Sequence, residues 1–568
     1  MISLQRLIVF GLLAVLTATS CAPTSPSSQD PSGRNPETQS GQRAKRVAAA
    51  MMGEPTAMVD RMNATQITVP GGRLLEMLAN AALTEVGAGA KLQPLLAEAV
   101  PTLENGLWKL SPDGKMETTW TIRPNARWHD GAPLVGEDFV FAATVDQDKD
   151  IPVLRPLGYN WVEQVRAPDS RTVTVTWSAP YIDADTMFTS AFASPLPRHV
   201  LEETFLRDKG AFLALPYWSQ EFVGTGPFRV RQFNPGVSVV LEANNDYVLG
   251  RPKLDEIEVR FILDPNTLVT NLLAGSVELT LGRGFAVENA LQLRDQWRDG
   301  NMLFRPRSWI ALHPQFMGPN PPIITDLRLR QALMYGTDRQ QLVDTLQGGL
   351  GGVAHMFLGP GEPEFAEVED SPVKYEYDPA RAIRMIESLG YARGADGIFR
   401  AADNQRLSVE IRSNGERITE NTIVPLANMW TTLGVAAVPL LVPPQRITDR
   451  EYVATFPGFR LMRQPNATAS FSRLRSTLTP LPENRFVGSN YARYVSVELD
   501  GLIDQFYATI PRPERVQTLR QIMRYISERL NHMGLFYDGD FMFANKRMQN
   551  ISGNETEIWN VHLWDAAS

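Results

Sequence analysis

The chain shows two hydrophobic periodicities that alternate along its length. Apolar and polar residues alternate strictly in Arg171–Trp177, which is typical of a half-exposed strand, and the pattern predicts further strands at Val237–Glu242 and Ile257–Leu263. Helical spacing predicts helices over four longer stretches, Asp326–Leu346, Pro379–Leu389, Thr422–Leu433 and Glu514–Leu530. Mixed elements without an internal repeat predict an α/β or α+β chain.

Local signals mark the ends of one helix. Asp378 and Pro379 supply an N-cap and a first-turn proline, and Gly390 follows the last apolar residue as a stop signal. The stretch Gly349–Ala354 fits the loosest dinucleotide-binding pattern, but it follows a predicted helix instead of a strand. We therefore interpret it as a glycine-rich helix exit.

Length and composition bound the class of protein. A chain of 568 residues is too long for one hydrophobic core, because single cores stop growing near ~250–300 residues, so at least two lobes are expected. The 43% hydrophobic and 21% charged residues are typical of a soluble globular protein. A net charge of −8 argues against nucleic acid as a partner.

The first residues have the features of a secretory signal. Arg6 precedes a short apolar run, and small residues then lead to Cys21, the single cysteine of the chain. Ala18–Cys21 resembles a bacterial lipobox, although Ala18 stands where leucine is commonest; in such signals cleavage precedes the cysteine and the thiol is acylated. We expect a signal peptide at 1–20 and a flexible tether at 21–49, with plain secretory cleavage as the alternative.

Motifs for catalysis and for metal binding are nearly absent. The chain has no Gly-x-Ser-x-Gly elbow, no His-Glu-x-x-His pair and no phosphate-binding loop. The six histidines show no metal-ligand spacing with one another or with the cysteine. We expect no enzymatic activity, no cofactor and no metal.

Five sequence blocks resemble the extracellular solute-binding proteins, family 5, which are the oligopeptide-, dipeptide- and nickel-binding subunits of bacterial ABC importers. The longest block, Trp128–Phe141, has the family's aromatic-x-Asp-Gly-x-Pro step into an acidic helix start, and we interpret it as a folding signature that touches no ligand. The other blocks keep the family's order: Leu92–Pro101, Gly224–Phe228, Ile324–Arg339 and Tyr377–Tyr391.

The resemblance implies a two-lobed periplasmic-binding-protein-like α/β fold, with crossover strands at the hinge and an extra subdomain on the first lobe. The implied boundaries are 50–80, 213–305 and 522–568 for a discontinuous lobe I, 81–212 for its subdomain, and 306–521 for lobe II. Ligand would be enclosed as the lobes close. We expect a monomer in the periplasm or on the outer face of the cell membrane, lipid-anchored and working with an ABC permease and ATPase complex.

The resemblance also points to ligand-binding candidates. Peptide-binding members carry an acid in lobe II that pairs with the peptide's amino terminus, and Gly458–Asn466 is the matching stretch here. Met462 stands at the acid's place between Arg460 and Arg463, with Phe459 keeping the family's aromatic. Arginine suits carboxylate or phosphate, so an anionic or neutral ligand is expected at this stretch. The alternative is that Arg460 and Arg463 are ordinary surface cations with no role in binding.

Further cleft candidates come from the same resemblance. Trp309 begins the segment entering lobe II, and Asn63 and Gln66 lie in the first-lobe segment that lines the pocket of peptide binders. Tyr491 and Tyr494 follow a loop placed to cover the cleft.

Several functions stay open at this point. The leading hypothesis is a binding protein for peptides or peptide-like solutes. A binder of another solute, such as an oligosaccharide, an opine-like conjugate or a metal chelate, is the first alternative, favoured by the missing acid at position 462. A secreted hydrolase is disfavoured by the motif search, and a sensor or chaperone of the same fold is not separable by sequence.

Overall fold

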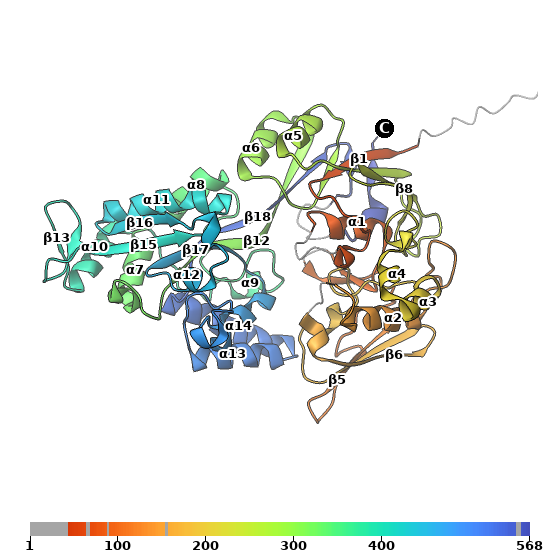
Figure 1. Ribbon diagram of the computed structural model, residues 1–568, viewed down its shortest axis with the longest axis horizontal. Helices are drawn as coiled ribbons and strands as arrows, with labels where there is room; N and C mark the ends of the chain where they lie inside the picture. The colour runs from red at the N-terminus through yellow and green to blue at the C-terminus, as the bar shows by residue number, and fades with distance from the viewer. Residues whose placement is uncertain (1–43, 64–68, 88–89, 154–156, 552–557, 568) are drawn as a thin grey trace, which may run out of the picture. The chain divides into compact units, whose positions relative to one another are not determined.

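The computed structural model describes residues 44–63, 69–87, 90–153, 157–551 and 558–567 (Figure 1). The expected signal peptide, Cys21 and Gln66 lie outside the described residues. Mixed helices and strands confirm the α/β class predicted from periodicity. The predicted strands are present as β7 (Thr172–Trp177), β9 (Ser238–Ala243) and β10 (Glu256–Phe261).

A ten-stranded sheet is the largest element of the fold. Its order is β16-β15-β17-β12-β18-β11-β1-β10-β9-β8. The two longest strands, β12 (Gly300–Pro314) and β18 (Met533–Asn545), pair antiparallel in its middle and join its two halves. The remaining strands are β1 (Arg46–Met51), β8 (Phe228–Asn234), β11 (Leu279–Leu281), β15 (Ser408–Ser413), β16 (Ala436–Leu441) and β17 (Phe459–Pro465).

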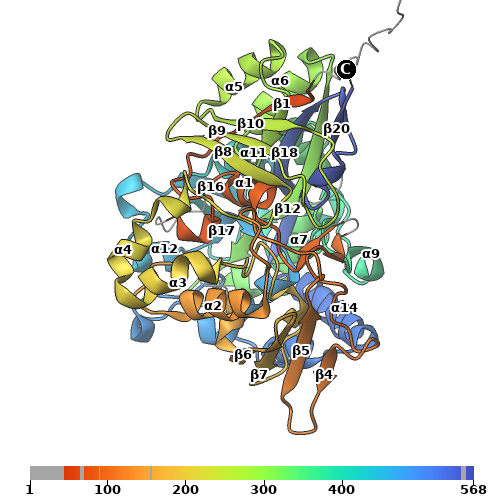
Figure 2. The same cartoon turned by 90° about the vertical axis from the view of Figure 1, so that its right-hand side faces the viewer.

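Helices pack beside the half of the sheet that contains β1 and β8–β11 (Figure 2). Helix α1 (Gly72–Ala79) buries Leu75 and Leu78 against this half. Helices α5 (Pro265–Leu273) and α6 (Val287–Gln296) form a separate small core with Phe541 and Phe543 of β18. The crossing strand β18 thus contributes side chains to the core of this half.

The other half of the sheet, β15–β17, packs against α11 (Arg417–Leu433), with α7 (Leu327–Tyr335), α8 (Arg339–Gln347) and α10 (Pro379–Ser388) sharing the same core. The prediction of one helix over Asp326–Leu346 is wrong. Gly336 ends α7, and the Asp338 side chain then caps α8 by accepting the Gln341 N–H at 2.9 Å. An N-cap two residues after the glycine starts a new helix although the apolar spacing continues.

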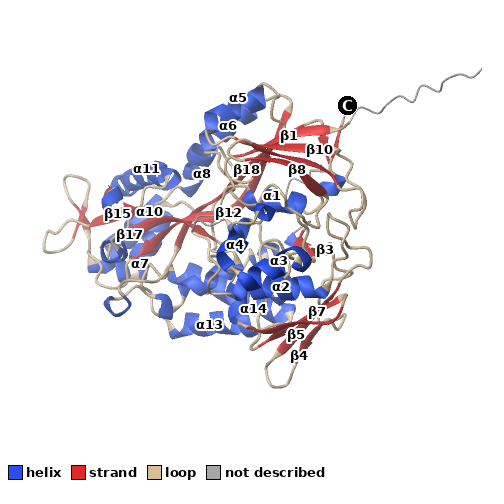
Figure 3. Cartoon of the chain, turned by 45° about the vertical axis from the view of Figure 1, so that its right-hand side comes forward, coloured by secondary structure: helices blue, strands red, loops and turns tan. Residues whose placement is uncertain are grey.

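A second, four-stranded sheet has the order β4-β5-β7-β6, with β4 (Trp108–Leu110), β5 (Met116–Thr121) and β6 (Val162–Asp169) joining β7 (Figure 3). Helix α2 (Gly136–Gln147) begins where the acidic pair of the Trp128–Phe141 block predicts. Asp138 accepts hydrogen bonds from the Val135 N–H and the Trp128 indole, each at 3.0 Å. The block therefore closes its own turn onto a helix start.

Helices α13 (Val497–Ala508) and α14 (Arg512–Arg529) pack on each other, and α9 (Phe365–Val368) contacts α14. The expected lobe boundary at 521/522 falls inside α14. The smaller elements are α3 (Arg198–Arg207), α4 (Lys209–Leu213), α12 (Arg450–Ala454), β2 (Thr84–Val86), β3 (Leu92–Pro94), β13 (Ala392–Arg393), β14 (Phe399–Arg400), β19 (Met548–Gln549) and β20 (Asp565–Ala566).

Candidate ligand-binding site

A cavity of about 600 Å³ lies against the middle of β12 and β18. Arg305, Arg307 and Ser308 of β12 and Asp540–Met542 of β18 line it. Further lining comes from the segment around α1, from Gly282 and Arg283 after β11, and from β17. This volume is within the ~300–1,000 Å³ typical of small-molecule pockets.

The two long strands approach each other closely beside the cavity. Their register breaks between Pro306 and Ser308, where a bulge inserts an extra residue. Pro306 pairs with Gly539, and a Cβ on Gly539 would lie 2.0 Å from the Arg305 carbonyl oxygen. Glycine is therefore required at 539, and the bulge sets the directions in which Arg305 and Arg307 project.

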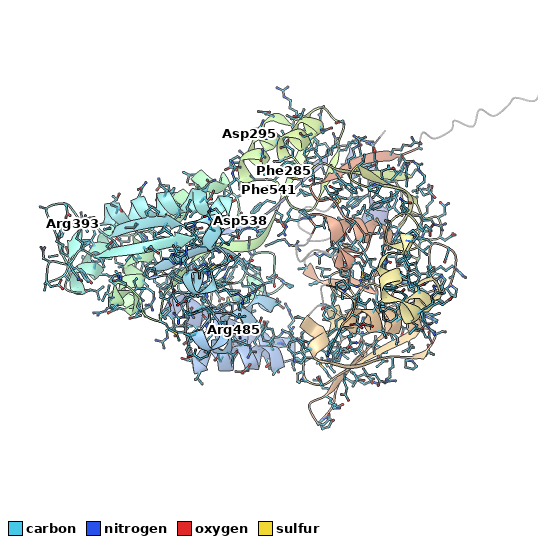
Figure 4. All side chains as sticks on the ribbon, viewed as in Figure 1. Phe285, Asp295, Arg393, Arg485, Asp538 and Phe541 are labelled. Carbon is cyan, nitrogen blue, oxygen red and sulfur yellow. The ribbon has the colours of Figure 1, made fainter. Side chains whose placement is uncertain are left out.

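Asp538 on β18, labelled in Figure 4, anchors Arg463 on β17. Arg463 Nε donates to Asp538 Oδ2, while Gln347 Nε2 donates to Asp538 Oδ1 at 2.9 Å and Ser308 Oγ donates at 3.3 Å. Burial alone lowers the pKa of Arg463, but the Asp538 carboxylate outweighs burial and leaves that pKa above its ordinary value. The Arg463 cation is thus fixed at the cavity wall, with Asp540 3.7 Å away.

Arg61 is a second fixed cation, and it lines the cavity from the short 3₁₀ turn Asp60–Met62. Its Nε donates to Asp146 of α2 at 2.8 Å, and its Nη2 donates to the Ser194 carbonyl at 3.0 Å. The Tyr159 hydroxyl also donates to Asp146, at 2.9 Å. The Arg61–Asp146 pair therefore links this wall of the cavity to helix α2.

Asp60 beside Arg61 has a raised pKa. Burial and the neighbouring Glu76 carboxylate raise the pKa of Asp60 to about 6, although Arg73 and a hydrogen bond from Asn63 oppose the shift. Asp60 is therefore a weaker acid than an ordinary aspartate. It can accept or donate a hydrogen bond near neutral pH.

Four more arginines line the cavity, and each is engaged in contacts of its own: Arg73, Arg283, Arg305 and Arg307. Arg305 is 8% exposed and donates Nη2 to the Met542 sulfur at 3.2 Å, whereas Arg283 and Arg307 are exposed. Such a lining can hold a ligand by charge and hydrogen bonds. Among the described residues no group of three His, Cys, Asp or Glu side chains is placed to hold a metal ion.

The family model for bacterial extracellular solute-binding proteins, family 5 (middle part), matches residues 91–473. The chain belongs to this family. Family 5 members are solute-binding proteins of ABC transporters and are not enzymes. No helix within the described ranges is long and apolar enough to cross a membrane.

Similar proteins and solved structures include solute-binding proteins, in agreement with the family match. The oligopeptide-binding protein AppA of Bacillus subtilis (strain 168) is 24% identical over 99% of this chain and 98% of its own length. The structure of Bacillus subtilis AppA with a nonapeptide has a TM-score of 0.64 at 20% identity and covers 93% of this chain and 100% of the other. The substrate-binding protein CtaP of Listeria monocytogenes has a TM-score of 0.72 at 19% identity, covering 92% and 100%. The two-lobed fold inferred from the sequence blocks is confirmed.

Arg463 lines the cavity, whereas the six other described candidates of this family 5 chain lie elsewhere. Arg460 is 2% exposed and stacks on the Tyr491 ring at 4.3 Å, where burial lowers the pKa of Arg460 to about 10. Phe459 is buried against Trp430, with ring centroids 5.1 Å apart.

The other candidates have local packing contacts. Trp309 is 1% exposed, packs on Phe357 and lines a second, very small cavity. Asn63 accepts the Thr56 and Ala57 N–H groups at 2.9 Å, and so holds a turn. The Tyr494 hydroxyl bonds with that of Tyr525 at 2.9 Å.

The sequence reasoning missed most of the arginines of the cavity. Arg305 and Arg307 lie two residues apart in β12. On a regular strand this spacing places two side chains on the same face, so it is a sequence signal that could have found both. No comparable signal marks Arg61, Arg73 or Arg283, which reach the cavity from separate segments.

Proposed function

We propose that this family 5 protein is the extracytoplasmic substrate-binding lipoprotein of an ABC importer, which captures peptides or peptide-like solutes between two lobes and delivers them to the permease. The observation that carries the proposal is the cavity of about 600 Å³ beside the two long strands that join the halves of the sheet. A cavity at this position is lined by residues from both halves, so a bound solute contacts both.

The crossing strands supply a mechanism for coupling binding to delivery. The bulge at Pro306–Ser308 and the obligatory Gly539 interrupt regular pairing beside the cavity. A solute that contacts residues on both sides stabilises the arrangement in which those residues approach, and a permease can recognise that arrangement. The bodies that we propose to move are lobe I at 50–80, 213–305 and 522–568, its subdomain at 81–212, and lobe II at 306–521. Helix α14 spans the 521/522 boundary and should move as one piece with lobe II, because it packs on α13 and α9.

Direct binding and uptake measurements test the proposal. Calorimetric titration with peptides of two to five residues should give saturable binding, and the peptides should be recovered chemically intact. Deleting the gene should lower uptake of the same peptides, and the wild-type gene should restore uptake. Cleavage that exceeds stoichiometry and survives repurification would contradict a binding role.

A non-peptide solute is the second candidate function, and the arginines of the cavity favour it. The lining holds six arginines, and β17 presents Arg463 there while Met462 does not line the cavity. An oligosaccharide, an opine-like conjugate or a metal chelate that binds where every peptide fails would support this alternative.

A further inference from the structure

Positive charge predominates in the lining of the cavity. Three carboxylates line it, from Asp60, Glu416 and Asp540, against six guanidinium groups, from Arg61, Arg73, Arg283, Arg305, Arg307 and Arg463. Bulk composition does not explain this excess, because the whole chain has 63 acidic and 55 basic residues. Cations therefore gather at this one place in an acidic protein.

Two of the six guanidinium groups have a carboxylate partner behind the cavity wall. Arg61 pairs with Asp146 and Arg463 pairs with Asp538, both of which are buried. The other four are engaged in contacts of their own. A guanidinium carries five N–H donors, so an arginine that already has a partner can also donate to a ligand.

The carboxylates of the lining compensate this charge only in part. Asp540 lies 3.7 Å from Arg463, which already has Asp538. Asp60 lies near Arg73, and its pKa of about 6 leaves part of the population protonated in mildly acidic surroundings. Even with all three carboxylates ionised, the six guanidinium groups of the lining outnumber them.

The arginines reach the cavity from both halves of the sheet. Arg61 and Arg73 come from the segment around α1, Arg305 and Arg307 from the crossing strand β12, and Arg463 from β17. Guanidinium groups on opposite walls suit a ligand with acidic groups at both ends. Partly enclosed charges are screened less by solvent than exposed ones, so such contacts are stronger here than on an open surface.

We infer that the cavity selects an anionic solute with two or more negative charges, which are carried by carboxylate or phosphate groups and held by arginines from both sides. The inference rests on the proposed binding function and narrows its substrate class. Bidentate guanidinium contacts give such a ligand both affinity and orientation. A free ammonium group would meet mostly cations and is disfavoured.

A series of matched tripeptides tests the charge class by calorimetric titration. The probes are N-succinyl-trialanine with two carboxylates, N-acetyl-trialanine with one, N-acetyl-trialanine amide with none, and trialanine amide with a free amine. N-acetyl-Ala-phosphoserine-Ala amide supplies the phosphate form of a dianion. The dianions should bind tightest and the free amine weakest. Added sodium chloride should weaken binding of the anionic probes, leave the neutral amide unchanged and not weaken the free amine.

Arginine variants at the exposed rim show whether the charge of the cavity carries the effect. Arg283→Gln with Arg307→Gln should weaken the tighter dianion about tenfold or more and weaken the neutral amide much less. Arg294→Gln with Arg328→Gln removes two exposed arginines outside the cavity lining, which are paired with Asp295 and Asp326, and should change neither.

The outcomes separate the inference from the function. Tightest binding of the neutral amide or the free amine, or an equal loss in both double variants, would overturn the charge inference and leave a peptide-binding protein. A phosphate probe that binds tighter than the succinyl probe supports the inference and identifies phosphate as the preferred acid. Failure of all five probes to bind at millimolar concentration would overturn the proposed peptide-binding function together with the inference.

Discussion

Arg463 on β17 donates a hydrogen bond from Nε to the carboxylate of Asp538 on β18, across the intervening strand β12. The pair links a cavity-lining side chain to a crossing strand, and Gln347 of α8 and Ser308 of β12 donate to the same carboxylate. Asp538 is 5% exposed. It therefore acts as the common acceptor for three elements beside the cavity.

Replacing Asp538 with Asn should destabilise the protein markedly. The change leaves the Arg463 cation without its buried carboxylate, and removing one partner of a buried pair costs about 3–5 kcal/mol in the free energy of unfolding. Asp540→Asn is the matched control, since Asp540 is 3.7 Å from Arg463 and 21% exposed, and it should cost less than ~1 kcal/mol. Urea unfolding measures both; equal losses would show that the Asp538 pair has no special role.

Gly539→Ala should disturb the crossing strands. The new Cβ would lie 2.0 Å from the Arg305 carbonyl oxygen, so the backbone must shift, and we expect a loss of about 2 kcal/mol or more together with weakened ligand binding. Gly501→Ala in α13 is the control, because its Cβ meets nothing within 4 Å; helix propensity should make it neutral or stabilising by about 0.5–1 kcal/mol. Thermal unfolding measures the stability of both variants, and calorimetric titration measures their ligand binding. Equal stability and binding in the two variants would contradict a special role for Gly539.

Sequence reasoning predicts the fold where the signals are local. The Trp128–Phe141 block contains both the tight turn at Gly131, with φ of 90°, and the Asp138 carboxylate that caps α2. Asp378 likewise caps α10 through the Arg381 N–H, as its position before Pro379 indicates. Such contacts span a few residues, so the sequence alone specifies them.

The cavity depends on contacts that local sequence does not encode. Arg460 and Arg463 are three apart on β17, and side chains at odd spacing point to opposite faces of a strand. Strand periodicity therefore predicts that the two side chains cannot both face the same cleft. It does not predict which of them faces the cavity. The partner Asp538 is 75 residues away from Arg463, and only the tertiary fold brings the two together.

The expected lipid anchor at Cys21 is tested by fractionation. Wild-type protein should be processed to a chain that begins at an acylated Cys21 and should partition into detergent, because an acyl chain buries apolar surface. Cys21→Ser should give a soluble or unprocessed form. The prediction is wrong if both proteins remain in the aqueous phase with identical processing by mass spectrometry.

Glu362→Gln should reverse a loss of stability that develops as pH rises. Burial raises the pKa of Glu362 to about 7; the Thr468 N–H, donating at 3.2 Å, opposes the shift, and Glu364 and Asp183 add to it. The folded pKa exceeds the ordinary value of 4.5, so folding favours the protonated acid. Its contribution is full below about pH 4.5 and is lost as pH rises through 7.

Gln cannot ionise, so the variant should gain about 1–2 kcal/mol on wild type between pH 5 and pH 8. Urea unfolding at both values measures this difference, with the exposed Glu369→Gln as a control that should show none. A pH-independent offset for Glu362→Gln would mean that this carboxyl stays ionised in the folded protein throughout the range.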